Sequence, residues 1–267
     1  MSPDLIDTPI LLIGCGRLGS AIVEGWLGQG AFDPRRLMIV TPSPKPVADR
    51  AARAGAVVNP GPDAVAAAQI VVLSVKPAKW REATAELAPS LAPGAVVVSV
   101  MAGVRADDIG AALGRPVARV MPTTAVATGQ GVAALWSGHS GAADAARALF
   151  APLADVVELA EEDRIDVATA VAGSGPAYVH AFTRAMAVAG VEAGLSAQEA
   201  TRLARGAVRS AAAASLDEDI EALIARIASP GGTTEAGLEA AKAAGLDGAA
   251  AAAVAAALKR ARELSGR

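Results

Sequence analysis

Short apolar runs alternate with alanine-rich stretches of helical periodicity over the first 160 residues of the chain. The runs are apolar at successive positions, which is typical of strands covered on both faces, whereas a half-exposed strand alternates apolar and polar residues. The order of the elements predicts a doubly wound parallel sheet whose strands are connected by helices. The expected strands are Ile10–Ile13, Leu37–Thr41, Ile70–Val75, Val96–Val100, Ala118–Met121 and Val156–Leu159.

From Glu161 onward the apolar positions recur at helical spacing, and we find no strand-like run of β-branched residues. Clusters of Gly, Pro and Ser at Gly173–Pro176 and Ser229–Gly232 separate the helical stretches. The helices are long, apolar and poor in charge, so we expect part of their surface to form a subunit interface. The expected helices are Ala177–Ala193, Ala197–Ala214 and Gly248–Leu264.

Length and composition limit the fold class and the partners. A chain of 267 residues exceeds the usual size of one domain. Together with the change of pattern, this length predicts an α/β Rossmann domain over residues 1–160 and an all-helical domain over residues 161–267. A formal net charge of -3 offers no basic field to a nucleic-acid backbone. Since charges, Gly and Pro interrupt every long apolar stretch, we expect no membrane span.

A few single residues bear on the compartment and on metal binding. The only cysteine, Cys15, can form neither an internal disulfide nor a multi-thiolate metal site, which favours a reducing compartment. Residues Met1–Thr8 carry two aspartates and no apolar core, unlike a secretory signal, so we expect a cytoplasmic protein. His139 and His180 lack metal-ligand spacing and a partnered nucleophile, and we expect no metal.

The strongest local motif is a glycine-rich turn, Gly14-Cys15-Gly16-Arg17-Leu18-Gly19, between the first expected strand and an amphipathic helix. Gly14 permits a tight turn, Gly16 lets the backbone approach a pyrophosphate, and Gly19 lets the helix pack on the strand. The helix N-terminus adds free N–H groups and a positive dipole. Its place directly after a strand distinguishes a dinucleotide-binding turn from an ordinary glycine-rich turn, and Cys15 is expected to be an inert small residue within it.

The end of the second expected strand indicates which dinucleotide binds. An NAD site usually carries Asp or Glu there to bind the ribose 2′-hydroxyl, but this segment reads Ile39-Val40-Thr41-Pro42-Ser43-Pro44-Lys45. Ser43 and Lys45 could donate hydrogen bonds to a 2′-phosphate, although both could also be exposed turn residues. NADPH is therefore the expected cofactor, with NADH as the alternative.

Two further segments follow strands at the carboxyl edge of the expected sheet, where open α/β folds bind ligands. Lys76-Pro77 closes the run Val71–Val75, and Met101-Ala102-Gly103 closes the next strand. Lys76 could equally be a solvated strand end. Further along the chain, Glu162, Asp163 and Asp166 are typical of a charged segment before a helix.

In the helical half, the segment Ser229-Pro230-Gly231-Gly232-Thr233-Thr234 precedes a helix that begins near Glu235. Its two glycines leave backbone N–H groups unobstructed, so a carboxylate could dock on them and on the helix N-terminus, while its two threonines offer hydroxyls to a neighbouring nitrogen or oxygen. Helix capping by threonine is the alternative. Gly173–Pro176 predicts another helix start, with Ser174 as its N-cap.

Six motifs carry a family resemblance: Ile13–Gly19, Val75-Lys76-Pro77, Ala102-Gly103, Arg119-Val120-Met121-Pro122, Gly173-Ser174-Gly175-Pro176-Ala177-Tyr178 and Ser229–Thr234. With them the chain resembles pyrroline-5-carboxylate reductase over nearly its whole length. The resemblance implies reduction of Δ1-pyrroline-5-carboxylate to L-proline, the last step of proline biosynthesis. It also implies homodimers that build larger rings through the helical domain.

The resemblance also implies residue roles. Cofactor contacts would fall on Gly14, Cys15, Gly16, Arg17, Leu18, Gly19, Ser43, Ser74, Val75, Lys76, Pro77, Met101, Ala102 and Gly103, to which the residues themselves add Lys45. Substrate contacts would fall on Ser229, Gly231, Gly232, Thr233 and Thr234. Thr234 would lie nearest the ring nitrogen, and because that loop has no His, Cys or Lys, it is the expected catalytic residue.

The chain departs from the family pattern at several positions, and three alternatives stay open. Many relatives carry Asn-Met at Arg17-Leu18, Asn at Thr123 and Asn near Pro62, which bears on cofactor affinity more than on the reaction class. One alternative is a reductase of another cyclic imine. A second is a 3-hydroxyacid dehydrogenase, which typically uses a lysine on an interdomain helix, whereas here no Lys lies between Lys79 and Lys242. The third is a non-catalytic dinucleotide-binding protein.

Overall fold

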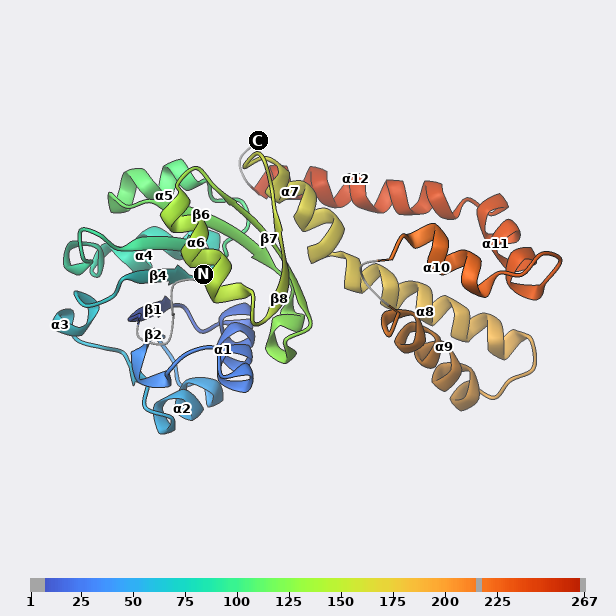
Figure 1. Ribbon diagram of the computed structural model, residues 1–267, viewed down its shortest axis with the longest axis horizontal. Helices are drawn as coiled ribbons and strands as arrows, with labels where there is room; N and C mark the ends of the chain where they lie inside the picture. Colours follow the sequence, from blue (N-terminus) through green and yellow to red (C-terminus); the bar gives the residue numbers. More distant parts are fainter. Residues whose placement is uncertain (1–7, 215–217, 265–267) are drawn as a thin grey trace. The chain divides into compact units, whose positions relative to one another are not determined.

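The computed structural model describes residues 8–214 and 218–264, and its largest element is an eight-stranded sheet of order β3-β2-β1-β4-β5-β6-β7-β8 (Figure 1). Neighbouring strands are parallel except β6 and β7, which are antiparallel. The expected doubly wound sheet is confirmed. Its strands are β1 (Ile10–Ile13), β2 (Leu37–Val40), β3 (Val57–Val58), β4 (Ile70–Leu73), β5 (Val96–Ser99), β6 (Val117–Pro122), β7 (Gly131–Ser137) and β8 (Ala154–Glu158).

Helices cover both faces of this sheet, which explains the continuous apolar runs. Ile10 and Leu12 of β1 point into one hydrophobic cluster, whereas Leu11 and Ile13 point into the other. Because each face is buried, neither set of positions can be polar. The first cluster contains side chains from α1 (Arg17–Gln29), α2 (Pro46–Arg53) and α6 (Ser140–Phe150), and the second from α3 (Pro62–Val65), α4 (Trp80–Ala85) and α5 (Ala106–Leu113).

Two strands and several short turns were not expected from the pattern. β3 has only two residues, and β7 reads Gly-Val-Ala-Ala-Leu-Trp-Ser, whose small residues resemble the helical stretches. The edge strand β8 begins two residues before the expected Val156. Short 3-10 turns connect the elements: η2 (Pro34–Arg36), η3 (Pro77–Lys79), η4 (Ala88–Ser90) and η5 (Thr124–Thr128).

The rest of the described chain is helical, as expected. After α7 (Arg164–Ala168), the π-helical turn η6 (Thr169–Gly173) leads into α8 (Gly175–Glu192), for which Ser174 is the N-cap residue. The later helices are α9 (Ala197–Ala212), α10 (Ile220–Ile227), α11 (Thr233–Ala243) and α12 (Leu246–Leu264). The chain divides into two compact units, of which the second is Ser174–Ala257.

Within the second unit α8 packs on α9 through small residues. A side chain at Gly190 would lie 3.3 Å from the Cβ of Ala200, so the two backbones approach closely. Among the described helices, none is by itself long and apolar enough to cross a bilayer, while α11 and α12 together reach that length and hydropathy as a pair bent by 53°.

Candidate functional site

Four connections meet at the carboxyl edge of the parallel strands, on both sides of the point where the strand order reverses between β1 and β4. They follow β1, β2, β4 and β5, and every cofactor residue expected from the sequence lies in them or at the start of the helix or turn that follows. Backbone hydrogen bonds join the first residues of two connections to the last residues of neighbouring strands: Gly14 N donates to Val40 O at 2.9 Å, and Ser74 N donates to Ile13 O at 2.8 Å. The sheet therefore brings these segments together on one edge.

The glycine-rich turn after β1 is shaped by its contacts with β4. Gly14 has a φ of +97°, and a side chain there would lie 2.5 Å from the carbonyl oxygen of Ser74. At Gly19, in the first turns of α1, a side chain would lie 2.3 Å from the carbonyl oxygen of Gly14. At Gly16, in contrast, no atom of the described residues, apart from its immediate neighbours in the chain, lies within 4 Å of the Cβ position. The first and third glycines thus serve packing, while the second leaves open space at the helix N-terminus.

Cys15 is buried within this turn. Its Sγ lies 3.6 Å from Ser20 Oγ. Burial raises the pKa of the Cys15 thiol, and the hydrogen bond with Ser20 and the charge of Lys45 oppose this effect only in part. The thiol is therefore protonated at neutral pH, which suits a small buried residue and not a nucleophile. Arg17 is exposed and Leu18 half-buried.

The loop after β2 is held by a residue that the sequence analysis missed. Asn59 has a φ of +51°, in the left-handed region that Asn tolerates better than most residues. Its Oδ1 accepts a hydrogen bond from Thr41 N at 2.9 Å, and Thr41 Oγ1 donates to Ser43 O at 3.0 Å. The loop is thus fixed from inside, with the Ser43 side chain exposed and Lys45 half-buried at the N-cap position of α2.

The segments after β4 and β5 differ in exposure. Ser74 and Val75 are half-buried, whereas Lys76 and Pro77 are exposed. After β5, Met101 is buried, and Ala102 and Gly103 are half-buried. Gly103 has a φ of +74°, so the chain turns there in a conformation that favours glycine.

In the helical unit, the loop before α11 makes several hydrogen bonds within itself. Gly231 has a φ of +70°, and its N–H donates to Glu235 Oε2 at 2.7 Å. Gly232 N donates to Ser229 O at 2.9 Å. The loop thus engages both glycine N–H groups, and a bound carboxylate would compete with Glu235.

The threonines of this loop are not capping residues. Gly232 is the N-cap of α11, and no side chain accepts a capping hydrogen bond there. Thr233 and Thr234 are the first two residues of the helix, Thr233 exposed and Thr234 half-buried. Both hydroxyls thus lie next to backbone N–H groups that a helix leaves without intrahelical acceptors.

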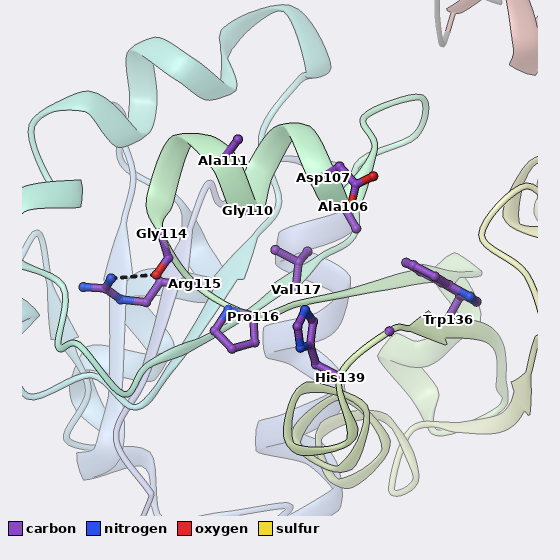
Figure 2. A pocket seen from close by; sticks show the side chains of 11 residues that line it. Ala106, Asp107, Gly110, Ala111, Gly114, Arg115, Pro116, Val117, Trp136 and His139 are labelled. Carbon is purple, nitrogen blue, oxygen red and sulfur yellow. Dashed lines mark hydrogen bonds between the residues drawn. The ribbon is translucent and has the colours of Figure 1, made fainter.

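A separate hollow of about 490 Å³ lies along α5 (Figure 2). The residues that line it include Asp107, Trp136 and His139, and none of the expected site residues is among them. The guanidinium of Arg115, at its rim, donates to the backbone carbonyls of Leu91, Ala92 and Gly114 at 2.7 to 2.9 Å. Among the described residues no three His, Cys, Asp or Glu side chains are arranged to hold a metal ion.

Both parts of the chain match models of known protein families. Residues 162–264 match the family model described as pyrroline-5-carboxylate reductase dimerisation, and residues 9–103 match the model described as NADP oxidoreductase coenzyme F420-dependent. The pyrroline-5-carboxylate reductase of Pseudomonas aeruginosa is 35% identical over 97% of this chain and 98% of its own. That of Escherichia coli is 34% identical over 86% and 88%.

Solved structures show the same similarity. A pyrroline-5-carboxylate reductase from Coxiella burnetii is 28% identical, with a TM-score of 0.88 over 97% of this chain and 98% of that one. The pyrroline carboxylate reductase of Plasmodium falciparum, solved with NADP bound, is 23% identical, with a TM-score of 0.81 over 97% and 99%. That comparison, at 23% identity, shows a shared fold.

Proposed function

Because the chain belongs to the pyrroline-5-carboxylate reductase family and is thus an oxidoreductase, we propose that it reduces Δ1-pyrroline-5-carboxylate to L-proline with NADPH. The observation that carries the cofactor part is the glycine turn, where Gly14 and Gly19 are packed and Gly16 is open at a helix N-terminus. Such an opening accepts a pyrophosphate, and a side chain would fill it. The reaction would be the last step of proline biosynthesis, in the cytoplasm.

We assign the two halves of the chain different tasks. Residues 1–160 would hold the cofactor, and residues 161–267 would hold the substrate and form the subunit interface. The chain's dimerisation-type helical half supports a homo-oligomer.

NADPH is favoured over NADH by the loop after β2. The described loop has no carboxylate between Thr41 and Lys45 to bind a ribose 2′-hydroxyl. Ser43 is exposed, and Lys45 is half-buried at the N-cap position of α2, in the same loop. A 2′-phosphate would therefore find a hydroxyl and a cation at this edge.

The proposed reaction requires little acid–base catalysis by the protein. When bound, the reduced nicotinamide supplies a hydride to an imine carbon whose nitrogen already carries a proton. The residues of the chain have to bind and align the substrate. The first-turn N–H groups of α11 would hold its carboxylate, and Thr234 Oγ1 would hydrogen-bond the ring nitrogen and pass it solvent protons.

An absorbance assay of NADPH oxidation with pyrroline-5-carboxylate tests this proposal. We expect turnover with NADPH and slower turnover with NADH. Binding of NADPH without turnover would favour a non-catalytic protein, and turnover with a 3-hydroxyacid and NADP⁺ instead would favour the dehydrogenase. Turnover of a different cyclic imine at a higher kcat/KM would change the assigned substrate but not the assigned reaction class.

Thr234→Ala tests the catalytic role in the same assay. Losing one positioned hydroxyl is expected to lower kcat about tenfold to a hundredfold while the NADPH Kd stays unchanged. Thr234→Ser keeps the hydroxyl and is the control, expected to keep most of the turnover. Steady-state kinetics of the alanine variant equal to those of the parent would reject the role.

A further inference from the structure

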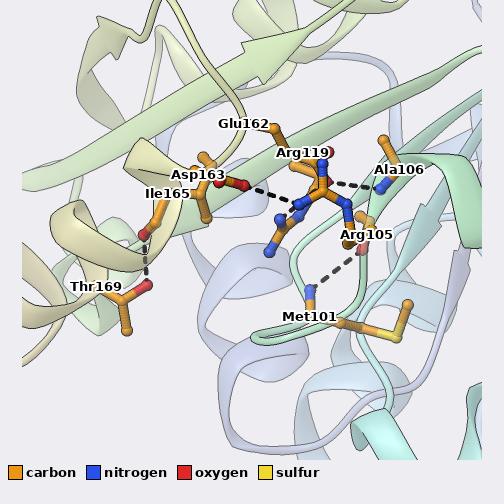
Figure 3. A network of polar contacts seen from close by, with 9 residues as sticks. Met101, Arg105, Ala106, Arg119, Glu162, Asp163, Ile165 and Thr169 are labelled. Atoms are coloured by element: carbon orange, nitrogen blue, oxygen red, sulfur yellow. Dashed lines mark hydrogen bonds and ion pairs between the residues drawn. The ribbon is translucent and has the colours of Figure 1, made fainter. Parts of the chain in front are cut away.

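A buried cluster of charges lies beside the Met101–Gly103 segment (Figure 3). Glu162, two residues before α7, is 6% exposed, and Arg119, on β6, is 1% exposed. Glu162 Oε1 accepts hydrogen bonds from Arg119 Nη1 at 3.0 Å and from Ala106 N at 2.8 Å. Glu162 Oε2 pairs with Arg105 Nη2 at 2.8 Å. This glutamate does lie in the charged segment before a helix that the sequence indicates, but it is buried and paired with two arginines.

The buried guanidinium of Arg119 is held by its pairing with the Glu162 carboxylate. Within the described part of the chain, its Nε and Nη2 are buried and have no hydrogen-bond partner, while Nη1 is paired with Glu162. A buried guanidinium with a single counter-charge is held in place by that charge. Moving Glu162 would therefore also release Arg119.

The connection between β5 and α5 is held at both ends, and the charged cluster holds its second end. At its start, Met101 N donates to the Oγ of Ser99, the residue that pairs with Arg119 across the β5–β6 register. At its end, Glu162 binds the side chain of Arg105 and the backbone N–H of Ala106, the first residue of α5. The conformation of residues 101–104 is thus set by partners outside the segment.

The position of this connection in the sheet indicates which end of the cofactor it would contact. β5 lies beyond β4, in the half of the sheet opposite to β2. In a doubly wound sheet one mononucleotide of the cofactor lies over each half. If the adenosine end lies at the loop after β2, the connection after β5 faces the nicotinamide end.

We propose that Glu162 is a positioning residue for the reductase: it sets the backbone of residues 101–104 on which the nicotinamide end of the cofactor rests. The inference rests on the proposed function, because only that function gives the segment a nicotinamide to hold. Glu162 touches neither cofactor nor substrate in this role and acts through Arg105, Arg119 and the N–H of Ala106.

The test compares Glu162→Gln with Glu161→Gln, which makes the same chemical change at the exposed neighbouring residue. Hydrogen exchange of the free protein is expected to speed up at residues 101–105 in Glu162→Gln and to stay unchanged at residues 14–19. Its kcat with NADPH is expected to fall about tenfold or more. Binding of 2′,5′-ADP, which has no nicotinamide, is expected to stay within twofold, whereas a merely structural defect would weaken it as well.

Glu161→Gln is expected to match the parent protein in all three measurements. A folded Glu162→Gln protein with parental exchange at residues 101–105 and parental kcat would overturn the proposal, as would equal losses for NADPH and 2′,5′-ADP. If that variant does not fold, Arg105→Gln is compared with Asp163→Asn, because Arg105 pairs with both Glu162 and Asp163 at 2.8 Å. Faster exchange at residues 101–105 in Arg105→Gln but not in Asp163→Asn supports the proposal, whereas parental exchange in Arg105→Gln or equally fast exchange in both variants overturns it. If the parent protein does not oxidise NADPH with pyrroline-5-carboxylate, the proposed function fails and the role of Glu162 at the nicotinamide falls with it, whatever the exchange data show.

Discussion

The glycines in the turn after β1 have different roles, and replacing each one by alanine distinguishes these roles. Gly16 has a φ of −76°, which any residue adopts, and open space around its Cβ position. Gly16→Ala is therefore expected to fold with a free energy of unfolding within about 0.5 kcal/mol of the parent. Its NADPH Kd is expected to rise about tenfold or more, because the methyl group occupies the space for the pyrophosphate. Urea unfolding and a fluorescence titration measure the two quantities.

Gly14→Ala is the contrasting variant. Its φ of +97° and the carbonyl oxygen of Ser74 at 2.5 Å make any side chain strained. This change is expected to lower stability, so a loss of binding in it would say little about contact with the cofactor. Parental NADPH affinity in Gly16→Ala would show that the cofactor does not approach the turn.

At the scale of elements, α1 is held against η5 by one close approach. A side chain at Gly25 would lie 2.1 Å from the carbonyl oxygen of Val126. The adjacent Trp26 is fixed, since its Nε1 donates to Leu149 O at 2.9 Å, so α1 cannot shift freely. Gly25→Ala is expected to lower the free energy of unfolding by about 2 to 3 kcal/mol, as overpacking does. Urea denaturation measures this loss.

Gly28→Ala, on the same helix, is the matched control. Outside its own helix backbone, no atom in the described part of the chain lies within 4 Å of its Cβ position, so the methyl group meets open space. Replacing a helical glycine by alanine there is expected to leave stability unchanged or to raise it by up to about 1 kcal/mol. Equal effects of the two changes would mean that α1 does not pack closely on η5.

The strands and loops also show which features of the fold could be predicted from the sequence. Strands such as β1 and β4 could be predicted, because burial on both faces requires apolar residues at every position. β7 could not, since its alanines and glycine have no strand signal of their own and its pairing with β6 decides its conformation. The glycine turn carries a local signal, whereas Asn59 and Glu162 act on partners 18 and 56 residues away in the chain. No local pattern reports such contacts.

On the scale of the whole molecule, the helical unit exposes apolar side chains that a single chain does not cover. Phe182 on α8 is 51% exposed, Leu203 on α9 is 61% exposed, and Ile220 and Ile227 on α10 are 71% and 69% exposed. Few residues of these helices are buried in the described chain, in contrast to the sheet, whose strands β1 and β4 are wholly buried. Apolar surface of this extent indicates contact with another subunit.

Phe182→Glu tests whether this surface joins two copies of the chain. The parent is expected to sediment at twice the 26.4 kDa mass of the chain or more. A carboxylate at position 182 would be buried without a partner in such an interface, which costs several kcal/mol, so the variant is expected to sediment at a lower mass. Ala112→Glu, an exposed change on α5 in the first unit, is the control and is expected to leave the mass unchanged. Sedimentation of the parent as a monomer at micromolar concentration would contradict the homo-oligomer, and an unchanged mass of Phe182→Glu would place the interface elsewhere on the chain.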